Sequence, residues 1–416
     1  MQAIQKVKTG IPNSEVYDKI LAYNAGRDPL RLNIKLAKMA KDPFSFLRGS
    51  CHLFYEGVHH ELNAINSPAT WICGDLHLEN FGSYKGDNGL AYFDINDFDE
   101  CALAPCLWEL TRLLTSLIVA EKKLQINQLQ SNNMLYDMLE RYAQTLASGK
   151  PKWVERKTAK GMVSNLLESL SKRSYKDFIN SRSELRTGKR RLIIDEKRVL
   201  KLSKKEKEAA LRIFKNIMPN TENGEFYYPL DIARRVAGTG SLGLERYVIL
   251  VLGEKSENKP RLIDIKQMNA SALTPYLSLK QPKWQNQAVR VATIQARAQA
   301  IAPALLKPVH FEQKAYLIKE LQPSQDRLDL SQWQGNLIRL DNVFETMAEV
   351  VAWSHLRNAG FNQAAKPETF MKFGEDYPNW REAVQNIAKR AAEINHQQWV
   401  EFKCTYRNKA KSLISL

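Results

Sequence analysis

Two short polar segments of the chain carry side chains that could do chemistry. The first runs from Gly74 to Asn80 and reads Gly-Asp-Leu-His-Leu-Glu-Asn, and Asp94 follows fourteen residues after Asn80. Phosphoryl transfer needs one carboxylate to orient the attacking hydroxyl and a set of oxygen ligands to hold Mg²⁺ against the phosphates. Asp75, Asn80 and Asp94 could supply these groups, and Asp97 is a rival to Asp94.

Loops rich in Asp, Asn and Gly are also common turns without chemistry. The chemical interpretation is favoured because the apolar runs Trp71–Cys73 and Leu90–Phe93 precede the loops and predict a hairpin-like pair of strands. His77, a second candidate catalytic residue, is a lone imidazole that we expect to orient the loop backbone rather than transfer protons. Arg48 could contact phosphate or brace the loops, and a structural ion pair is its alternative.

A glycine-rich loop, Gly238-Thr-Gly-Ser-Leu-Gly243, lies later in the chain. Glu245–Leu252 follows it and is typical of a strand, whereas a dinucleotide-binding fold needs a helix at this point. The next strand, Arg261–Lys266, has Leu262, Asp264 and Lys266 on one face by period-two alternation. Lys266 could therefore reach nucleotide phosphates, and the alternative is a solvent-facing lysine paired with Asp264.

The pattern Gly-Asp-Leu-His-x-x-Asn followed by apolar-apolar-Asp resembles the catalytic and metal loops of aminoglycoside phosphotransferases and the wider protein-kinase-like superfamily. This resemblance implies ATP and Mg²⁺ as cofactors, with Asp75 as catalytic base. It also implies that Asn80 and Asp94, or Asp97 of the triplet Asp97-Phe-Asp99, are the metal ligands. ATP-binding residues would be Gly238, Gly240, Ser241, Gly243 and Lys266. The histidine that usually precedes Gly-Asp is Cys73 here, which leaves the support of the loop open.

The order of these motifs resembles a circular permutation, because the glycine loop and lysine normally precede the catalytic loop. The sequence therefore predicts an α+β, two-lobed kinase-like fold, which a permutation permits if the relocated ends lie on the surface. Residues 1–150 would form the first part of a helical C-terminal lobe, 151–225 a basic and mostly helical insertion, 226–325 a β-rich N-terminal lobe, and 326–416 the remaining C-lobe helices.

A helix near residues 284–300 would take the place of the helix that anchors the lysine. It contains no Asp or Glu, so Gln295 is the best polar stand-in as a partner for Lys266. The combination also resembles a bacterial family catalogued only as a domain of unknown function, through Phe46–Gly49, Gly74–Gly82, Asn96–Glu100 and Val236–Lys266. That resemblance implies a fold and ATP binding but no substrate.

Composition places the chain among ordinary globular proteins. It has 416 residues, 44% hydrophobic and 25% charged, with five cysteines and no C-x-x-C pair. Its apolar runs are too short to cross a membrane, and its N-terminus lacks the apolar region of a secretory signal. We therefore expect a cytoplasmic protein with reduced thiols and no membrane partner.

Basic residues are concentrated in one region. The formal net charge is +16, and residues 151–210 hold 18 Lys and Arg against 8 Asp and Glu. Few aromatic residues accompany this charge, so a solvated helical face is favoured over a nucleic-acid or membrane surface. We expect no specific nucleic-acid partner, only weak and salt-sensitive anion binding through this stretch.

The leading functional expectation is an enzyme, an ATP- and Mg²⁺-dependent phosphotransferase acting on a hydroxyl of an unknown small molecule or protein. One alternative is nucleotidyl (AMP) transfer, in which an inverted nucleotide presents its α-phosphate to the same metal site. Another is a catalytically silent ATP-binding module with an anionic partner. The intact Asp75, Asn80 and Asp94 argue against the silent module.

Overall fold

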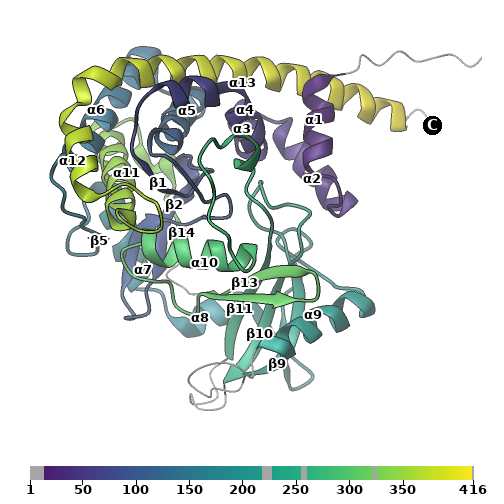
Figure 1. Ribbon diagram of the computed structural model, residues 1–416. Coiled ribbons are helices and arrows are strands. Elements are labelled where there is room, and N and C mark those ends of the chain that lie inside the picture. The colour runs from purple at the N-terminus through teal and green to yellow at the C-terminus, as the bar shows by residue number, and fades with distance from the viewer. Residues whose placement is uncertain (1–13, 218–226, 254–259, 322–325, 415–416) are drawn as a thin grey trace, which may run out of the picture.

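The computed structural model describes residues 14–217, 227–253, 260–321 and 326–414. Helices make up 52% and strands 19% of the structure, so the predicted α+β class is confirmed. The predicted domain boundaries at residues 225 and 325 lie outside the described residues. Figure 1 shows a helical unit on one side and a six-stranded sheet on the other.

The helical unit is built from both ends of the chain. Its N-terminal part comprises α1 (Glu15–Tyr23), α2 (Pro29–Met39), α3 (Pro43–Gly49), α4 (Cys51–Ala64), α5 (Leu107–Leu124) and α6 (Gln128–Ala147). Its C-terminal part comprises α11 (Leu337–Asn358), α12 (Pro367–Glu375) and α13 (Tyr377–Ile414), which runs across the top of the unit in Figure 1. Leucines at three- and four-residue spacing on α5 share one buried core with Met138 of α6 and Val351 of α11.

The predicted strands around the polar segments exist, but their predicted pairing is wrong. The strands are β1 (Ala69–Ile72), β2 (Phe81–Lys85), β3 (Ala91–Ile95) and β4 (Ala102–Pro105). β1 pairs with β4, whereas β3 pairs with β2 and with β5 (Val154–Glu155). The reason is that β2, directly after the 3₁₀ helix η1 (Leu78–Asn80), supplies the partner that β3 needs across a tight turn. β14 (Asp326–Arg327) pairs with the other edge of β2.

The six-stranded sheet is antiparallel throughout, in the order β12-β13-β11-β10-β9-β8. These strands are β8 (Val199–Leu200), β9 (Tyr227–Arg235), β10 (Arg246–Gly253), β11 (Pro260–Met268), β12 (Lys307–Phe311) and β13 (Lys314–Leu321). Period-two alternation sends Tyr247, Ile249 and Val251 to one face, where Phe214 of α9 (Lys204–Ile217) covers them. The opposite face looks toward the helical unit, with α10 (Gln287–Ala298) between β11 and β12 in sequence.

The basic stretch is structurally continuous with this sheet. It contains α7 (Gly161–Ser171), α8 (Tyr175–Asn180), the hairpin β6 (Ser183–Arg186) and β7 (Lys189–Leu192), then β8 and α9. β8 lengthens the sheet by pairing with β9, and Phe178 and Ile179 of α8 pack against its inner face. The 3₁₀ helices η3 (Thr274–Tyr276) and η4 (Leu330–Trp333) complete the described elements.

Two expectations from composition can be compared with the structure. All five cysteines are free thiols, and four of them are buried. None of the helices in the described ranges combines the length with the apolar composition that a membrane crossing requires.

Candidate functional site

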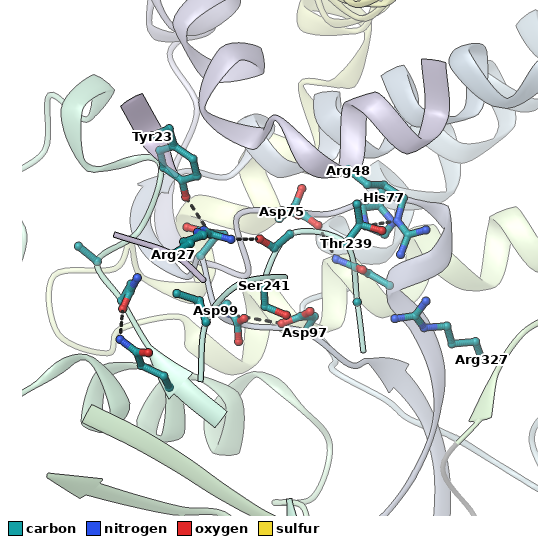
Figure 2. A pocket seen from close by; sticks show the side chains of 18 residues that line it. Tyr23, Arg27, Arg48, Asp75, His77, Asp97, Asp99, Thr239, Ser241 and Arg327 are labelled. Atoms are coloured by element: carbon teal, nitrogen blue, oxygen red, sulfur yellow. Dashed lines mark hydrogen bonds between the residues drawn. The ribbon is translucent and has the colours of Figure 1, made fainter. Parts of the chain in front are cut away.

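The glycine loop and the two polar segments meet around one cavity of about 380 Å³, which we call the main pocket. Figure 2 shows Asp97 and Asp99 next to each other, with Arg48 and Arg327 at the opposite end of the pocket from Tyr23 and Arg27. The predicted site residues that line it are Asp75, His77, Asn80, Asp97, Gly238, Gly240 and Ser241. The fold thus brings together segments more than 130 residues apart in the sequence.

Asp75 is held with one carboxylate oxygen fixed and the other directed at the glycine loop. Its Oδ1 accepts hydrogen bonds from Nε of Arg112, at 2.8 Å, and from Nη2 of the same fully buried side chain on α5. A methyl group on Gly240 would lie 3.8 Å from Oδ2. Gly74 sets the turn before it, with φ of +88° and a backbone oxygen of Glu100 at 2.3 Å from any added Cβ.

A buried network under this loop answers the question that Cys73 left open. Oε2 of Glu109 accepts hydrogen bonds from the backbone N–H of Cys73 at 2.6 Å and of Gly74 at 3.4 Å. The other oxygen of Glu109 contacts Nε2 of His355 at 2.5 Å, and Nδ1 of His355 contacts the Tyr142 hydroxyl at 2.8 Å. The loop is therefore anchored by a carboxylate from α5 rather than by a histidine in the motif.

Asp97 and Asp99, which line the main pocket, both lie next to Lys266. Lys266 Nζ forms an ion pair with Asp99 and lies 3.6 Å from Oδ1 of Asp97. Enclosure in the cleft raises the pKa of Asp97, but the Lys266 ammonium, a hydrogen bond with Asp99 and the charges of Lys319 and Arg246 together outweigh this effect, so the net shift is downward. Enclosure and the neighbouring Asp97 raise the pKa of Asp99. Two carboxylates this close repel each other, and a cation between them would offset this repulsion.

The donor set around this pair fits Mg²⁺. Asn80 donates its amide N–H to the Asp75 carbonyl, which leaves its amide oxygen as a ligand beside Asp97 and Asp99. In the described part of the chain no group of three or more His, Cys, Asp or Glu side chains is arranged to hold a metal ion. Mg²⁺ is commonly bound by only one or two carboxylates together with waters and substrate phosphates, so a smaller set suffices.

Asp94, the favoured metal ligand from sequence, lies elsewhere. Its carboxylate is buried behind β3, where it accepts hydrogen bonds from the backbone N–H of Ile95 at 2.8 Å and of Ala300 at 3.2 Å. Arg357 on α11 pairs with it at 3.2 Å. Burial raises the pKa of Asp94 and these contacts oppose the rise. Asp94 points inward because it belongs to a paired strand, whereas Asp97 lies beyond the strand end.

Gln295 is not the partner of Lys266 that sequence suggested. Its Oε1 accepts a hydrogen bond from Nζ of Lys319 at 2.6 Å, because β13 lies between β11 and the strand that follows α10. The carboxylate partners of Lys266 are instead Asp97 and Asp99. Enclosure and the nearby Lys266 ammonium lower the pKa of Lys319 to about 8.

His77 and Arg48 brace the segment Gly74–Asn80. His77 is buried, its Nδ1 accepts the backbone N–H of Glu79 at 3.2 Å, and burial lowers its pKa well below the usual range. Arg48 Nη1 pairs with Glu79 at 2.5 Å, and Lys123 pairs with the same carboxylate. Arg48 therefore forms a structural ion pair and lines the pocket as well.

The glycine loop is held from outside by α2 and by the turn that precedes it. Arg27 Nη1 donates to the carbonyls of Gly240 at 2.6 Å and Leu242 at 2.9 Å, and Lys35 donates to Gly240 at 3.1 Å. Gly243, with φ of +92°, packs so closely that an added Cβ would lie 2.8 Å from Arg27. No motif in residues 24–35 signalled this contact.

A second cavity of about 150 Å³ lies beneath the sheet, and we call it the roof pocket. Asp264 is buried there, with Arg235 and Arg246 each 2.6 Å from its Oδ2. Both guanidinium groups outweigh the effect of burial and lower the pKa of Asp264. Lys266, Lys319 and Arg327 also line this pocket.

Sequence reasoning missed several residues of the site. Arg112 had a usable signal, because it is the only cationic residue in the segment 107–117. Asp99 also had a signal, because aspartate occurs twice in the triplet Asp97-Phe-Asp99. Arg27, Arg235 and Lys319 had none, since only tertiary pairing brings them to the cleft.

These features define an α+β protein with a polar cleft between an antiparallel sheet and a helical unit. Residues 27–405 match the model of a family described as an uncharacterized protein conserved in bacteria (DUF2252), so the chain belongs to this family. No curated protein and no solved structure matches the chain.

Proposed function

We propose that this protein is an ATP- and Mg²⁺-dependent phosphotransferase with a circularly permuted kinase-like fold, acting on a hydroxyl group. One observation carries the proposal. Asp75, whose Oδ2 is directed at the glycine loop, lines the same cavity as a lysine-bound carboxylate pair, Asp97 and Asp99. Their separation in sequence makes this convergence a property of the fold rather than of one loop.

The arrangement of the sheet also supports the proposal. Strand β9, the glycine loop, strand β10, the lysine strand β11, helix α10 and two further strands follow one another in the order expected for a kinase-like N-terminal lobe. The helical unit that follows in an ordinary kinase is here divided between the two ends of the chain.

Each residue of the cleft has a role in the proposed reaction. Asp75 Oδ2 would take the proton of the acceptor hydroxyl while the hydroxyl oxygen bonds to the γ-phosphorus. The bond between the γ-phosphorus and the oxygen that bridges it to the β-phosphorus breaks, and ADP leaves. Asn80, Asp97 and Asp99 would hold Mg²⁺, which neutralises phosphate charge. Lys266 would turn from the carboxylates to the phosphates once the cation binds.

Nucleotidyl transfer is the second candidate, and the roof pocket favours it. Arg246 and Lys319 place positive charge deep under the sheet, where it would attract the far end of a triphosphate. A nucleotide bound with its γ-phosphate there would present its α-phosphate nearer to Asp75. The acceptor oxygen would then bond to the α-phosphorus and pyrophosphate would leave.

Incubation with ATP labelled on either the α- or the γ-phosphate tests both candidates. Phosphoryl transfer moves the γ-label to an acceptor or, by leakage, to water, whereas nucleotidyl transfer moves the α-label and releases pyrophosphate. Asp75→Asn should reduce either rate by about 10²- to 10⁴-fold, the usual contribution of a positioned base, with little loss of ATP affinity. An Asn variant that is as fast as wild type would remove Asp75 from the base role. Binding of Mg-ATP with neither label released would leave a silent nucleotide-binding module.

A further inference from the structure

The face of the sheet that looks into the cleft is divided into an apolar part and a charged part. Val248, Leu250 and Leu262 form the apolar part together with Leu321. They alternate along the strands with the residues covered by α9 on the other face. Phe178 of α8 packs on them in one buried cluster. The chain thus covers the apolar part of this face with its own basic stretch.

This covering matters for nucleotide binding because a base is usually held in a concave and mostly apolar site. On the inner face of the sheet, as far as the structure describes it, α8 takes up the surface that could stack on a base. The part left open is the roof pocket, which has a volume of about 150 Å³ and a charged lining.

Positive charge in the roof pocket exceeds what its carboxylates neutralise. Five cationic side chains line it against four carboxylates; the cations are Arg235, Arg246, Lys266, Lys319 and Arg327, and the carboxylates are Glu79, Asp97, Asp99 and Asp264. Asp264 pairs with two guanidinium groups, those of Arg235 and Arg246. Lys319 has the neutral amide of Gln295 as its hydrogen-bond partner, and no described acidic side chain lies within ion-pair distance of its Nζ. Enclosing an ammonium group without a carboxylate in direct contact is unfavourable, so its retention beside a cavity points to an anionic ligand.

We infer that the roof pocket is a phosphate subsite, in which Lys319 and Arg246 bind the end of a nucleotide phosphate chain while the base stays outside the sheet. The inference rests on the proposed function for its nucleotide, and this position of the terminal phosphate is the one that the nucleotidyl-transfer candidate requires. Asn80, Asp97 and Asp99 line both cavities, so a phosphate chain can pass the metal ligands between them. The base then lies toward Tyr23 and Gln267 in the main pocket.

Binding measurements on the full chain with Mg²⁺ test the subsite, using inorganic tripolyphosphate, adenosine, ATP, GTP and UTP as probes. Tripolyphosphate should bind and compete with ATP, adenosine should not compete, and the three nucleotides should differ by less than about threefold. Lys319→Met should weaken tripolyphosphate and ATP about tenfold to hundredfold, the range for one charge-assisted hydrogen bond. Lys314→Met is the matched control, because Lys314 lies on the same strand but pairs with Glu245 outside the pocket.

The outcomes separate this inference from the proposed function. If Lys319→Met, shown to be folded by its melting transition, binds tripolyphosphate as wild type does, the subsite is refuted. Competition by adenosine, or strong preference for one base, refutes it as well. If the binding pattern is as expected but neither label of ATP is transferred or released, the subsite stands and the proposed function fails.

Discussion

At the scale of single residues, the direction in which a carboxylate side chain points decides whether it can bind a ligand. Asp94 and Asp97 are three positions apart, yet one is buried against Arg357 and the other is 45% exposed toward the cleft. Lysine contact, enclosure and access coincide at Asp97 and Asp99. Asp94 is better explained as a structural residue that joins β3 to α11.

The two aspartates should therefore respond differently to substitution. We expect Asp97→Asn to remove most of the Mg²⁺-dependent part of the thermal stabilisation by ATP, because a ligand that binds only the folded state stabilises it in proportion to its affinity. Asp94→Asn should instead lower the free energy of unfolding by about 3 kcal/mol without ligand, since Arg357 loses its buried partner. A thermal-shift titration with and without Mg²⁺ measures both effects. Loss of the Mg²⁺-dependent part only in Asp94→Asn would return the metal role to Asp94.

His52 predicts how stability depends on pH. Its ring is buried against Tyr23 with a centroid separation of 4.0 Å, and neither ring nitrogen has a hydrogen-bond partner among the described residues. Burial, followed by the charges of Lys35 and Arg27, lowers its pKa from 6.5 to about 3. The unfolded chain therefore takes up a proton below pH 6.5 that the folded chain refuses until about pH 3, so stability falls as pH falls through this window.

Replacing this imidazole should remove that acid sensitivity. His52→Phe keeps the aromatic stacking, and its loss of stability between pH 7 and pH 5 should be smaller than that of wild type by about 2 kcal/mol. Urea unfolding at the two pH values measures the difference, with the exposed His60 substituted in the same way as a control. Equal losses for wild type and His52→Phe would show that His52 is not the group responsible.

At the scale of elements, the glycine loop is held by residues at the start of α2, which come before Gly74–Asn80 in the chain. Arg27 contributes two hydrogen bonds to loop carbonyls, and the backbone N–H of Asp28 donates to Gly243 at 3.1 Å. The glycine loop is thus held in place by residues from a different part of the chain. Its opening should require breaking these contacts.

Arg27→Met should loosen the loop without unfolding the protein. Loss of charge-assisted hydrogen bonds of about 1.5–3 kcal/mol predicts tenfold to hundredfold faster amide exchange over residues 238–243. Hydrogen-exchange mass spectrometry measures this rate. Arg31→Met is the control, because Arg31, in the first turn of α2, pairs with the Asp28 carboxylate at 2.5 Å, whereas the loop is contacted by the backbone N–H of Asp28. Unchanged exchange in Arg27→Met would mean that the loop is held by its own conformation.

The order of elements was predictable from sequence, but their pairing was only partly so. Hydrophobic alternation identified β10 and β11, and the strand after the glycine loop excluded a dinucleotide fold correctly. Alternation assigns residues to a face without naming the neighbouring strand, which is why β1 and β3 were paired wrongly. For the same reason the contact between Lys319 and Gln295 could not be foreseen, because it depends on where β13 joins the sheet.

At the scale of the whole molecule, the net charge is +16, and some of the basic residues behind it take part in the packing of the fold. In the basic stretch Arg156, Arg173 and Arg186 each pair with a carboxylate, and α8 uses its apolar side against the sheet. This stretch therefore builds the sheet unit, and its remaining charge is solvated. Both observations favour unspecific rather than sequence-selective anion binding.

Nucleic-acid binding should accordingly be weak and strongly dependent on salt. Each phosphate contact releases counterions, so the affinity should fall by about 10³-fold or more between 50 and 200 mM salt if six or more contacts form. Gel-shift measurements with mixed DNA and RNA over this range provide the test. A tight, sequence-selective complex at physiological salt would contradict the assignment and favour a binding module regulated by ATP.

The division of the helical unit between the two chain ends has a consequence for biosynthesis. Glu109 supports the catalytic loop through His355, which lies 246 positions later in the chain. At a translation rate of about 5–20 residues per second, the ribosome adds His355 roughly 12–50 s after Glu109. Until then the segment Gly74–Asn80 lacks this buried contact, while the whole sheet unit emerges. The cleft can be completed only after His355 has been added, so a product truncated before that residue retains the motifs but lacks the assembled site.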